Sequence, residues 1–283
     1  MNLLTWNIQW GRGCDGVVDL ARIAREAEKI VDADVICMQE IAVNFPGLSG
    51  SSGEDQITLL RDAFPQHQAH YGIATDLPDR RGGRSHFGNV VLSRLPVLQV
   101  FRHLLPWPSD PAVSSMQRIC VETVVQAPFG PLRVMTTHLE YYSAKQRMAQ
   151  VDALRALHAQ AYAHARHPRS DEERDSPFAV LPRGEFALIC GDFNFEPHQP
   201  EHDRMTELID GETPCLLDAW SLIHPGVQHA HTVGLHECEW PDRPYCCDFV
   251  FVSENLAPLV RRIDVDQRTD ASDHQPVVVE FAN

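Results

Sequence analysis

Long apolar runs are missing from this sequence of 283 residues, in which no stretch of about 18 apolar residues passes without a charge. We therefore expect no membrane-spanning segment. We also expect no export signal, because residues 1–9 form a strand pattern and lack a charged region followed by an apolar one. A cytoplasmic location follows as the default.

Basic side chains are scarce relative to acidic ones. Lys and Arg together number 24, Asp and Glu number 39, and the net charge is −15. This balance disfavours non-specific nucleic-acid binding, which depends on basic patches that displace counterions. It does not exclude such binding, because a local basic groove can lie on an acidic surface.

The eight cysteines are scattered, and several lie in strand-like runs, so we interpret all of them as thiols. Residues 224–247 gather a group of potential zinc ligands, namely His224, His229, His231, His236, Cys238, Cys246 and Cys247. Their spacing fits no regular finger pattern, which disfavours zinc in this segment and leaves the question open.

Strand-like and helical patterns alternate along the chain, which is typical of an α/β layer fold. Strands are expected at 3–8, 34–38, 68–72, 87–96, 118–126, 132–139, 187–190, 247–253 and 277–281, and helices at 17–31, 55–64, 143–165 and 200–209. The length suits one large sandwich, so we expect a single domain over residues 1–283.

The stretch 187–194, Ala-Leu-Ile-Cys-Gly-Asp-Phe-Asn, brings polar chemistry to the end of a buried strand. Asp192 could take a proton from water while Asn194 holds the same water by hydrogen bonds, as hydrolysis requires. Gly191 is expected to permit a sharp turn. The alternative is an Asx-type turn in which both side chains only cap backbone groups.

Other polar residues stand at the ends of apolar runs. Asn7 and Glu40 follow the first two strands, and if those strands are neighbours Glu40 becomes a metal-ligand candidate rather than an ordinary exposed glutamate. His138 ends a strand, where it is either structural or catalytic. Asn89 is a turn residue or a site residue. Asp248 lies inside a buried run and must face a partner.

Seven short motifs occur in an order that resembles the endonuclease/exonuclease/phosphatase superfamily. They are Thr5-Trp6-Asn7, Gln39-Glu40, residues 88–93 (Gly-Asn-Val-Val-Leu-Ser), Thr137-His138-Leu139, Gly191-Asp192-Phe193-Asn194, Asp248-Phe249-Val250-Phe251 and Ser272-Asp273-His274. Each motif is weak alone, but the ordered set spans nearly the whole chain. The resemblance implies a DNase I-like four-layer α/β/β/α sandwich, with two mixed β-sheets flanked by helices.

The resemblance also implies a divalent-metal-dependent hydrolase of phosphate esters, which acts by in-line attack of an activated water. Glu40 would hold Mg²⁺ or Mn²⁺, with Asn7 beside it and Asp273 as a further ligand. Asn7 and Asn89 would also contact substrate.

For catalysis, the resemblance implies that Asp192 activates or orients water and that Asn194 positions water and phosphate. His274, held by Asp248, would donate a hydrogen bond to a phosphoryl oxygen, and His138 would do the same from the other side.

Two positions depart from the family pattern. Cys246 stands where many members carry Arg, so a strut or phosphate contact is missing or comes from elsewhere. Gln9 stands where members that cut abasic DNA usually carry an acid. Together with the negative net charge, these departures weaken a DNA-repair interpretation.

The substrate therefore stays open between a phosphodiester and a phosphomonoester. A nuclease would be favoured by a basic groove of Arg80, Arg81, Arg84 and Arg94 near the site, with Trp107 or Tyr141 stacking on a base. A lipid or small-molecule diester would be favoured by an exposed apolar lip of Trp107 and residues 104–106. A non-catalytic binding module is the alternative of another class, and no obligate protein partner is expected.

Overall fold

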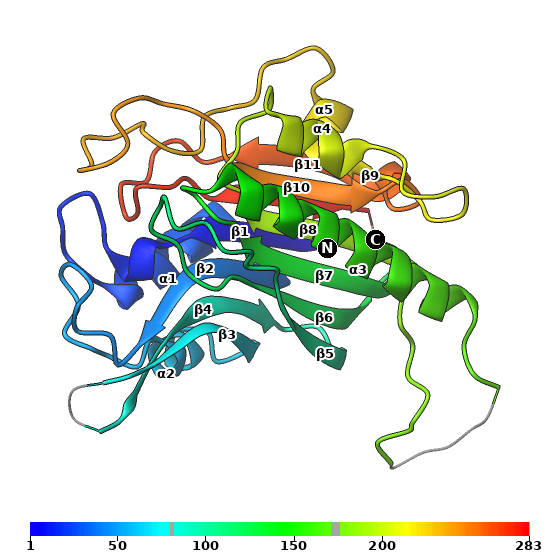
Figure 1. Cartoon of the computed structure of the whole chain (residues 1–283), viewed down its shortest axis with the longest axis horizontal. Coiled ribbons are helices and arrows are strands. Elements are labelled where there is room, and N and C mark those ends of the chain that lie inside the picture. The colour runs from blue at the N-terminus through cyan, green and yellow to red at the C-terminus, as the bar shows by residue number, and fades with distance from the viewer. Residues whose placement is uncertain (80–81, 171–175, 283) are drawn as a thin grey trace.

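Two six-stranded β-sheets pack face to face in this computed structural model, which describes residues 1–79, 82–170 and 176–282 (Figure 1). The first sheet has the order β11-β12-β1-β2-β4-β3 and the second β5-β6-β7-β8-β10-β9. The pairs β1–β2 and β7–β8 are parallel, and the other pairs are antiparallel, so both sheets are mixed.

The strand bounds differ from the expected ones mainly at the ends. The first sheet contains β1 (Asn2–Asn7), β2 (Val35–Val43), β3 (Gln68–Pro78), β4 (Arg84–Ser93), β11 (Val260–Val265) and β12 (Val277–Phe281). The second contains β5 (Val97–Leu104), β6 (Ile119–Ala127), β7 (Gly130–His138), β8 (Phe186–Asp192), β9 (Leu216–Asp218) and β10 (Asp248–Ser253). Sequence patterns missed β5, β9 and β11, all of which are edge strands and one of which, β9, is three residues long.

Helices cover the outer faces of the two sheets. They are α1 (Leu20–Ile30) and α2 (Gln56–Ala63) on the first sheet, and α3 (Ala144–Arg166) and α4 (Pro200–Thr206) on the second, with the short helices α5 (Ala219–Ile223), η1 (Gln9–Gly11) and η2 (Ala257–Leu259) in connections. One apolar cluster lies between the sheets, and two lie between a sheet and its helices. This arrangement confirms the predicted four-layer sandwich.

Side-chain caps set the starts of the main helices. Asp19, Asp55 and Ser143 each accept a hydrogen bond from a backbone N–H of the first turn of α1, α2 and α3. The apolar face of α1, with Leu20, Ile23 and Ala27 at helical spacing, is then buried against the first sheet.

One end of the sandwich collects the polar strand ends. Asn7 ends β1, His138 ends β7, and Asp192 ends β8, while Asp248 begins β10 directly opposite Asp192. Near Glu40 the pairing of β2 with β4 shifts register, and Glu40 itself has a φ of 63°. This bulge directs the Glu40 side chain to the same end of the sheets.

Gly191 lies inside β8 rather than in the sharp turn that the sequence suggested. Its φ is +133°, and a Cβ at this position would lie 2.0 Å from the carbonyl oxygen of Thr137 on the neighbouring strand. Glycine is therefore required because two backbones approach closely just before Asp192.

The expectation that all eight cysteines are thiols is wrong for two of them, because Cys14 and Cys238 form a disulfide. Their Cα atoms are 4.4 Å apart although 224 residues separate them in sequence. The fold brings the loop after η1 against the 224–247 segment, and scattered spacing cannot reveal such a contact. The described helices are all too short or too polar to span a bilayer.

Candidate active site

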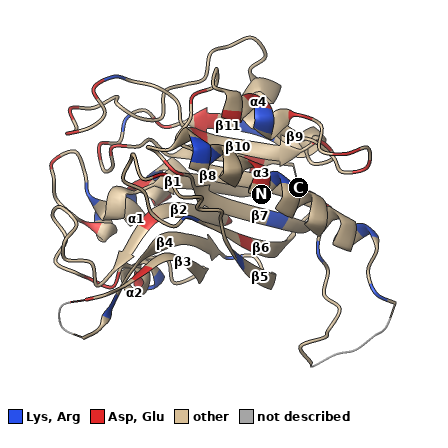
Figure 2. Cartoon of the chain, in the orientation of Figure 1, with Lys and Arg blue, Asp and Glu red and all other residues tan. Residues whose placement is uncertain are grey.

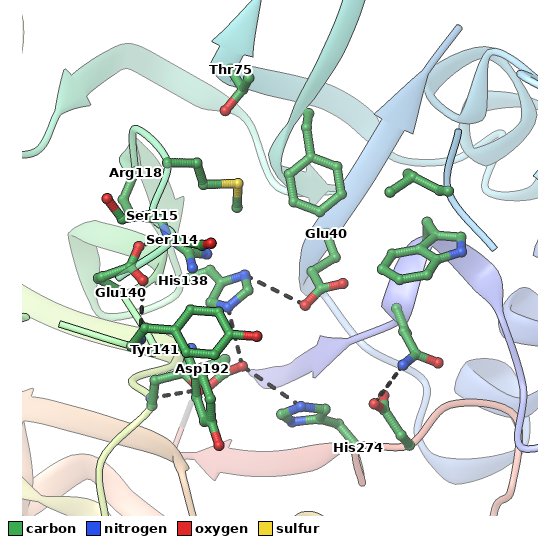
Figure 3. Close-up of a pocket in the computed structure, with 18 of the residues that line it drawn as sticks. Glu40, Thr75, Ser114, Ser115, Arg118, His138, Glu140, Tyr141, Asp192 and His274 are labelled. Carbon is green, nitrogen blue, oxygen red and sulfur yellow. Dashed lines mark hydrogen bonds and ion pairs between the residues drawn. The ribbon is translucent and has the colours of Figure 1, made fainter. Parts of the chain in front are cut away.

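A cavity of about 540 Å³ opens at the end of the sandwich where β1, β2, β7 and β8 finish (Figure 3). Six of its lining residues are polar or ionisable groups near the predicted site, namely Glu40, His138, Asp192, Asn194, Asp273 and His274. Residues distant in sequence thus share one pocket.

Asn7 joins two of the carboxylates at the floor of the site. Its Nδ2 donates to Glu40 Oε1 at 3.1 Å and to Asp192 Oδ2 at 3.0 Å. Its Oδ1 accepts the backbone N–H of Gln9 at 3.1 Å. Asn7 is fully buried and orients both acids. Its Oδ1, the oxygen that was expected to bind a metal, accepts this backbone hydrogen bond instead.

Two imidazoles approach Asp192 from opposite sides. His138 Nε2 lies 3.4 Å and His274 Nε2 lies 3.7 Å from Asp192 Oδ2. His138 Nδ1 is also 3.8 Å from Glu40 Oε1 (Figure 3). Asp192 Oδ1 accepts the backbone N–H of Asn194 at 2.9 Å, so its Oδ2 is the oxygen turned toward the histidines.

Asp248 holds His274, as the resemblance implied. Its Oδ2 accepts from His274 Nδ1 at 2.9 Å and from the Thr232 hydroxyl at 2.6 Å. The Trp6 indole N–H also donates to the His274 carbonyl at 2.9 Å, which anchors the backbone of the same residue. These contacts leave His274 Nε2 as the ring nitrogen facing the pocket.

The pKa values of the two histidines are shifted in opposite directions. Burial, and then the charge of Arg118, lowers the pKa of His138 to about 3. Burial also lowers the pKa of His274, but the carboxylates of Asp248 and Asp192 outweigh it, and the pKa lies well above its ordinary value. The surroundings of the two rings therefore shift their pKa values in opposite directions.

Two acids that line the cavity are Asp273, which is buried, and Glu40, which is partly buried. Burial, and then the charge of Asp273, raises the pKa of Glu40 to about 7, and burial also raises the pKa of Asp273. Gln9 donates to Asp273 Oδ2 at 2.7 Å, and in the described part of the chain no Lys or Arg bonds to either acid. Uncompensated hard oxygen ligands of this kind suit a divalent cation.

Backbone strain concentrates around the pocket. Among the described residues, five non-glycine residues have a positive φ, and four of them, Gln9, Trp10, Glu40 and Asn194, line the cavity. Non-glycine residues rarely adopt this conformation, and it persists where surrounding contacts enforce it, often at functional sites.

Of the remaining predicted residues, Asn194 lies in the cavity wall and Asn89 does not. Asn194 lines the pocket, and its Nδ2 donates to the Leu139 carbonyl at 2.9 Å. Asn89 is buried, and its Nδ2 donates to the Ile119 carbonyl at 3.1 Å. Asn89 is not among the residues that line the cavity, so the predicted substrate contact is replaced by a bond that holds the start of β6.

Several pocket residues were not predicted. Arg118 precedes β6, and its Nε donates to Glu140 Oε2 at 3.2 Å while its buried Nη1 has no hydrogen-bond partner among the described residues. The Cys247 thiol is not among the lining residues, but it shares a group of potential ligand atoms with Asp192 and His274, whereas the sequence grouped it only with the potential zinc ligands of residues 224–247. Arg118 belongs to none of the sequence motifs, so only the tertiary structure reveals its place in the pocket.

Aromatic side chains form much of the wall. Trp10, Phe45, Phe87, Tyr141, Tyr142 and Trp240 line the cavity, together with Leu48 and Met116. The Tyr141 and Trp240 rings meet edge to face with centroids 5.3 Å apart. The expected lip is only partly present, because Leu105 is buried and Trp107, although half exposed, bonds to Ser115 and is not a lining residue.

The two described arginines of the groove that would favour a nuclease, Arg84 and Arg94, do not line this pocket. Arg84 pairs with Asp76, and Arg94 pairs with Asp32 and Asp34 beside the start of β2, at the other end of the sheet from Glu40. Arg80 and Arg81 lie outside the described residues. Among the described residues, Arg118 is the only lysine or arginine that lines the cavity. Figure 2 shows acidic and basic residues interspersed along the elements.

Comparisons with known proteins point to one family. The family model described as Endonuclease/Exonuclease/phosphatase family matches residues 4–274. Among curated proteins, none matches this chain.

Similar folds occur in solved structures. An endonuclease/exonuclease/phosphatase from Beutenbergia cavernae is 24% identical, with a TM-score of 0.68 over 100% of this chain and 72% of that chain. The Bacteroides thetaiotaomicron mannosyl-6-phosphatase is 16% identical, with a TM-score of 0.65 over 100% of both chains. D. rerio TDP2 complexed with single-strand DNA product is 16% identical, with a TM-score of 0.63 over 100% of this chain and 99% of that chain.

Proposed function

The chain belongs to the Endonuclease/Exonuclease/phosphatase family, and from this premise we propose that it is a divalent-metal-dependent hydrolase of phosphate esters. The observation that carries the proposal is that Glu40, Asp192, His138 and His274 line one cavity, with both imidazoles within 3.7 Å of Asp192 Oδ2. Phosphoryl transfer needs an activated nucleophile and groups that neutralise charge on the phosphoryl oxygens, and this set supplies both.

Glu40 and Asp273 would hold the ion, with Mg²⁺ or Mn²⁺ suited to their hard oxygens. Bound there, the ion would offset charge on the phosphoryl and leaving oxygens. Burial and the charge of Asp273 raise the pKa of Glu40 to about 7, and a cation bound between these two acids would offset that repulsion. Asn7 orients Glu40 through its amide, which makes it a positioning residue in this proposal.

Asp192 would accept the proton from the attacking water. Its Oδ1 is fixed by the Asn194 N–H at 2.9 Å, which keeps Oδ2 directed to the reacting groups, and Asn194 lines the pocket where that water would lie. His274, charged and held by Asp248 at 2.9 Å, would donate from Nε2 to a phosphoryl oxygen. His138 would donate as a neutral imidazole on the other side.

Arg118 would supply the phosphate contact that the family pattern places where this chain has Cys246. Its guanidinium lines the cavity, and its Nη1 has no hydrogen-bond partner among the described residues. A guanidinium group matches the geometry of phosphoryl oxygens and stays charged at neutral pH.

We propose a small phosphate ester with an apolar or aromatic leaving group as the substrate class. A cavity of about 540 Å³ walled by six aromatic residues suits such a group. One lining arginine and a net charge of −15 are a poor match for a polyanionic strand. Nuclease activity is therefore an outcome that the test must be able to reveal, and not our first choice.

Hydrolysis of bis-p-nitrophenyl phosphate and p-nitrophenyl phosphate, with Mg²⁺, Mn²⁺ or EDTA, tests this function. We expect metal-dependent release that Asp192→Asn lowers by about 10²–10⁴-fold. The matched control is Asp62→Asn, the same chemical change at an exposed position of α2. The ratio of diester to monoester turnover separates phosphodiesterase from phosphatase, and a single-stranded oligonucleotide at low salt probes nuclease activity.

Two results would contradict the proposal. Equal turnover by Asp192→Asn and wild type would remove Asp192 from the chemistry. The second result has two parts: none of the three substrates is hydrolysed, and calorimetry shows that Asp273→Asn does not weaken Mg²⁺ binding. Together these findings would indicate a binding module on this fold.

We further propose that residues 1–283 form one catalytic domain, which is supported by the pairing of the first strand, β1, with the last, β12. The cytoplasmic location stays a prediction. It rested on the absence of an export-signal pattern, and the Cys14–Cys238 disulfide does not favour it, because disulfides are rare in reducing compartments.

A further inference from the structure

Three side chains outside the pocket converge in a second group. His202 comes from α4, Asp218 ends β9, and His229 lies between α5 and β10. Their potential ligand atoms all lie within 4.8 Å of one another. The Nε2 atoms of His229 and His202 lie 2.5 Å and 3.2 Å from the same oxygen, Asp218 Oδ2.

Asp218 is buried and needs a positive partner. Its side chain is 4% exposed, and in the described part of the chain no Lys or Arg bonds to it. Ser221 donates to Oδ2 at 3.0 Å, and the Trp220 backbone N–H donates to Oδ1 at 3.0 Å. A buried carboxylate must be hydrogen-bonded, paired or bound to a cation, so the two imidazoles at Asp218 Oδ2 either donate hydrogen bonds to it or hold a metal ion with it.

The surroundings favour a metal ion enclosed by protein. The His202 ring lies 5.4 Å from Phe249 and 5.6 Å from Phe251 between centroids, and the His229 ring lies 5.6 Å from Phe249. The two imidazole planes are 83° apart, so their nitrogens reach Asp218 Oδ2 from different directions. An apolar shell limits solvent access and strengthens ligand binding at a metal site.

We propose that His202, Asp218 and His229 bind a Zn²⁺ ion that joins α4, β9 and the 224–247 segment. Imidazole nitrogens with one carboxylate suit Zn²⁺ and do not suit Mg²⁺ or Ca²⁺, which prefer oxygen alone. Three protein ligands leave the fourth tetrahedral position to water. Only His229 belongs to the 224–247 segment, which explains why its internal spacing resembles no zinc motif.

The site would support the pocket from outside. The segment that His229 anchors also carries Thr232, which donates to Asp248 at 2.6 Å, and Trp240, which lines the cavity. A zinc ion would therefore stabilise the fold next to the His274 partner without touching the reacting groups.

The test is Zn²⁺ binding to the full chain, measured by competition with a chromophoric chelator in saturating Mg²⁺. The variant is the double substitution His202→Gln, His229→Gln, and the control is His164→Gln, at an exposed position of α3. We expect the double variant to bind one Zn²⁺ fewer per chain than wild type and the control. Zn²⁺ should also raise the Tm of wild type and control, and raise that of the double variant less.

Equal stoichiometry and affinity in the double variant and wild type would overturn the proposal, because the group of Asp192, Cys247 and His274 is intact in both proteins. No Zn²⁺ bound by wild type would do the same, and would leave the cluster as a hydrogen-bond network. If the double variant does not fold in EDTA, His202→Gln alone gives the same comparison. None of these results bears on phosphate-ester hydrolysis.

Discussion

His158 is expected to make the protein less stable in mild acid. It is fully buried on α3, where its Nδ1 accepts from Arg133 Nη2 at 3.0 Å and its Nε2 donates to the Pro214 carbonyl at 2.9 Å. Burial, and then the charge of Arg133, lowers the pKa of His158 from 6.5 to about 4. A proton on Nδ1 would replace an acceptor with a donor that faces a guanidinium group.

The sign and size of the effect follow from the two pKa values. Because the pKa of His158 is lower in the folded state, its contribution is complete above pH 6.5 and is lost as the pH falls toward 4. Between pH 7 and pH 5, protonation should shift the equilibrium toward the unfolded state by about 20-fold, which is about 2 kcal/mol.

Urea unfolding at pH 7 and pH 5, in EDTA and at constant ionic strength, measures this change. We expect the free energy of unfolding to fall by about 2 kcal/mol less in His158→Gln than in wild type. His164→Gln, at an exposed position of the same helix, should behave like wild type. Other buried groups titrate alike in all three proteins and cancel. Equal pH dependence in His158→Gln and wild type would refute the reasoning.

Three further substitutions test the pocket. Asp248→Asn should lower kcat by about 10²–10⁴-fold. The fold should be kept, because Asp248 Oδ1 has no hydrogen-bond partner among the described residues and the new NH₂ can take its place. An unchanged kcat would count against the His274 pairing. Trp240→Ala should raise KM for an aryl ester more than for a methyl ester, since its ring lines the cavity, and equal changes would argue against aromatic recognition. Gly191→Ala should lower the free energy of unfolding by at least about 2 kcal/mol, because the new Cβ would lie 2.0 Å from the Thr137 carbonyl oxygen. Gly47→Ala, whose Cβ would have no atom within 4 Å, should not lower it. Chemical denaturation of the two variants measures the difference.

Polar residues at strand ends were the part of the site that the sequence could predict. Asn7, His138 and Asp192 each follow an apolar run and end a strand, so their side chains lie at the edge of the sheets where those strands end. The buried run predicted only that Asp248 has a partner, and the family resemblance implied that this partner is His274, as the structure shows.

Contacts between distant loops were not predictable. Arg118, the aromatic wall and the Cys14–Cys238 disulfide depend on how loops from both sheets pack at the same end, and no local pattern encodes that packing. Asn89 shows the opposite failure. It stands in a motif, but its amide bonds to the backbone of β6, so its type is explained by strand pairing and not by the pocket.

The two histidines differ in the direction of their pKa shifts, and this difference depends on the tertiary structure and not on the sequence motifs. His138 and His274 each belong to a short motif, and both have a ring nitrogen within 3.7 Å of Asp192 Oδ2. His274 bonds to a second carboxylate, Asp248, whereas His138 lies near Arg118, so their pKa values move in opposite directions. A hydrolase site needs groups of different protonation state at one pH. In this chain both rings are buried, and the difference comes from the charged neighbours that the fold places near each of them, Arg118 for His138 and Asp248 for His274.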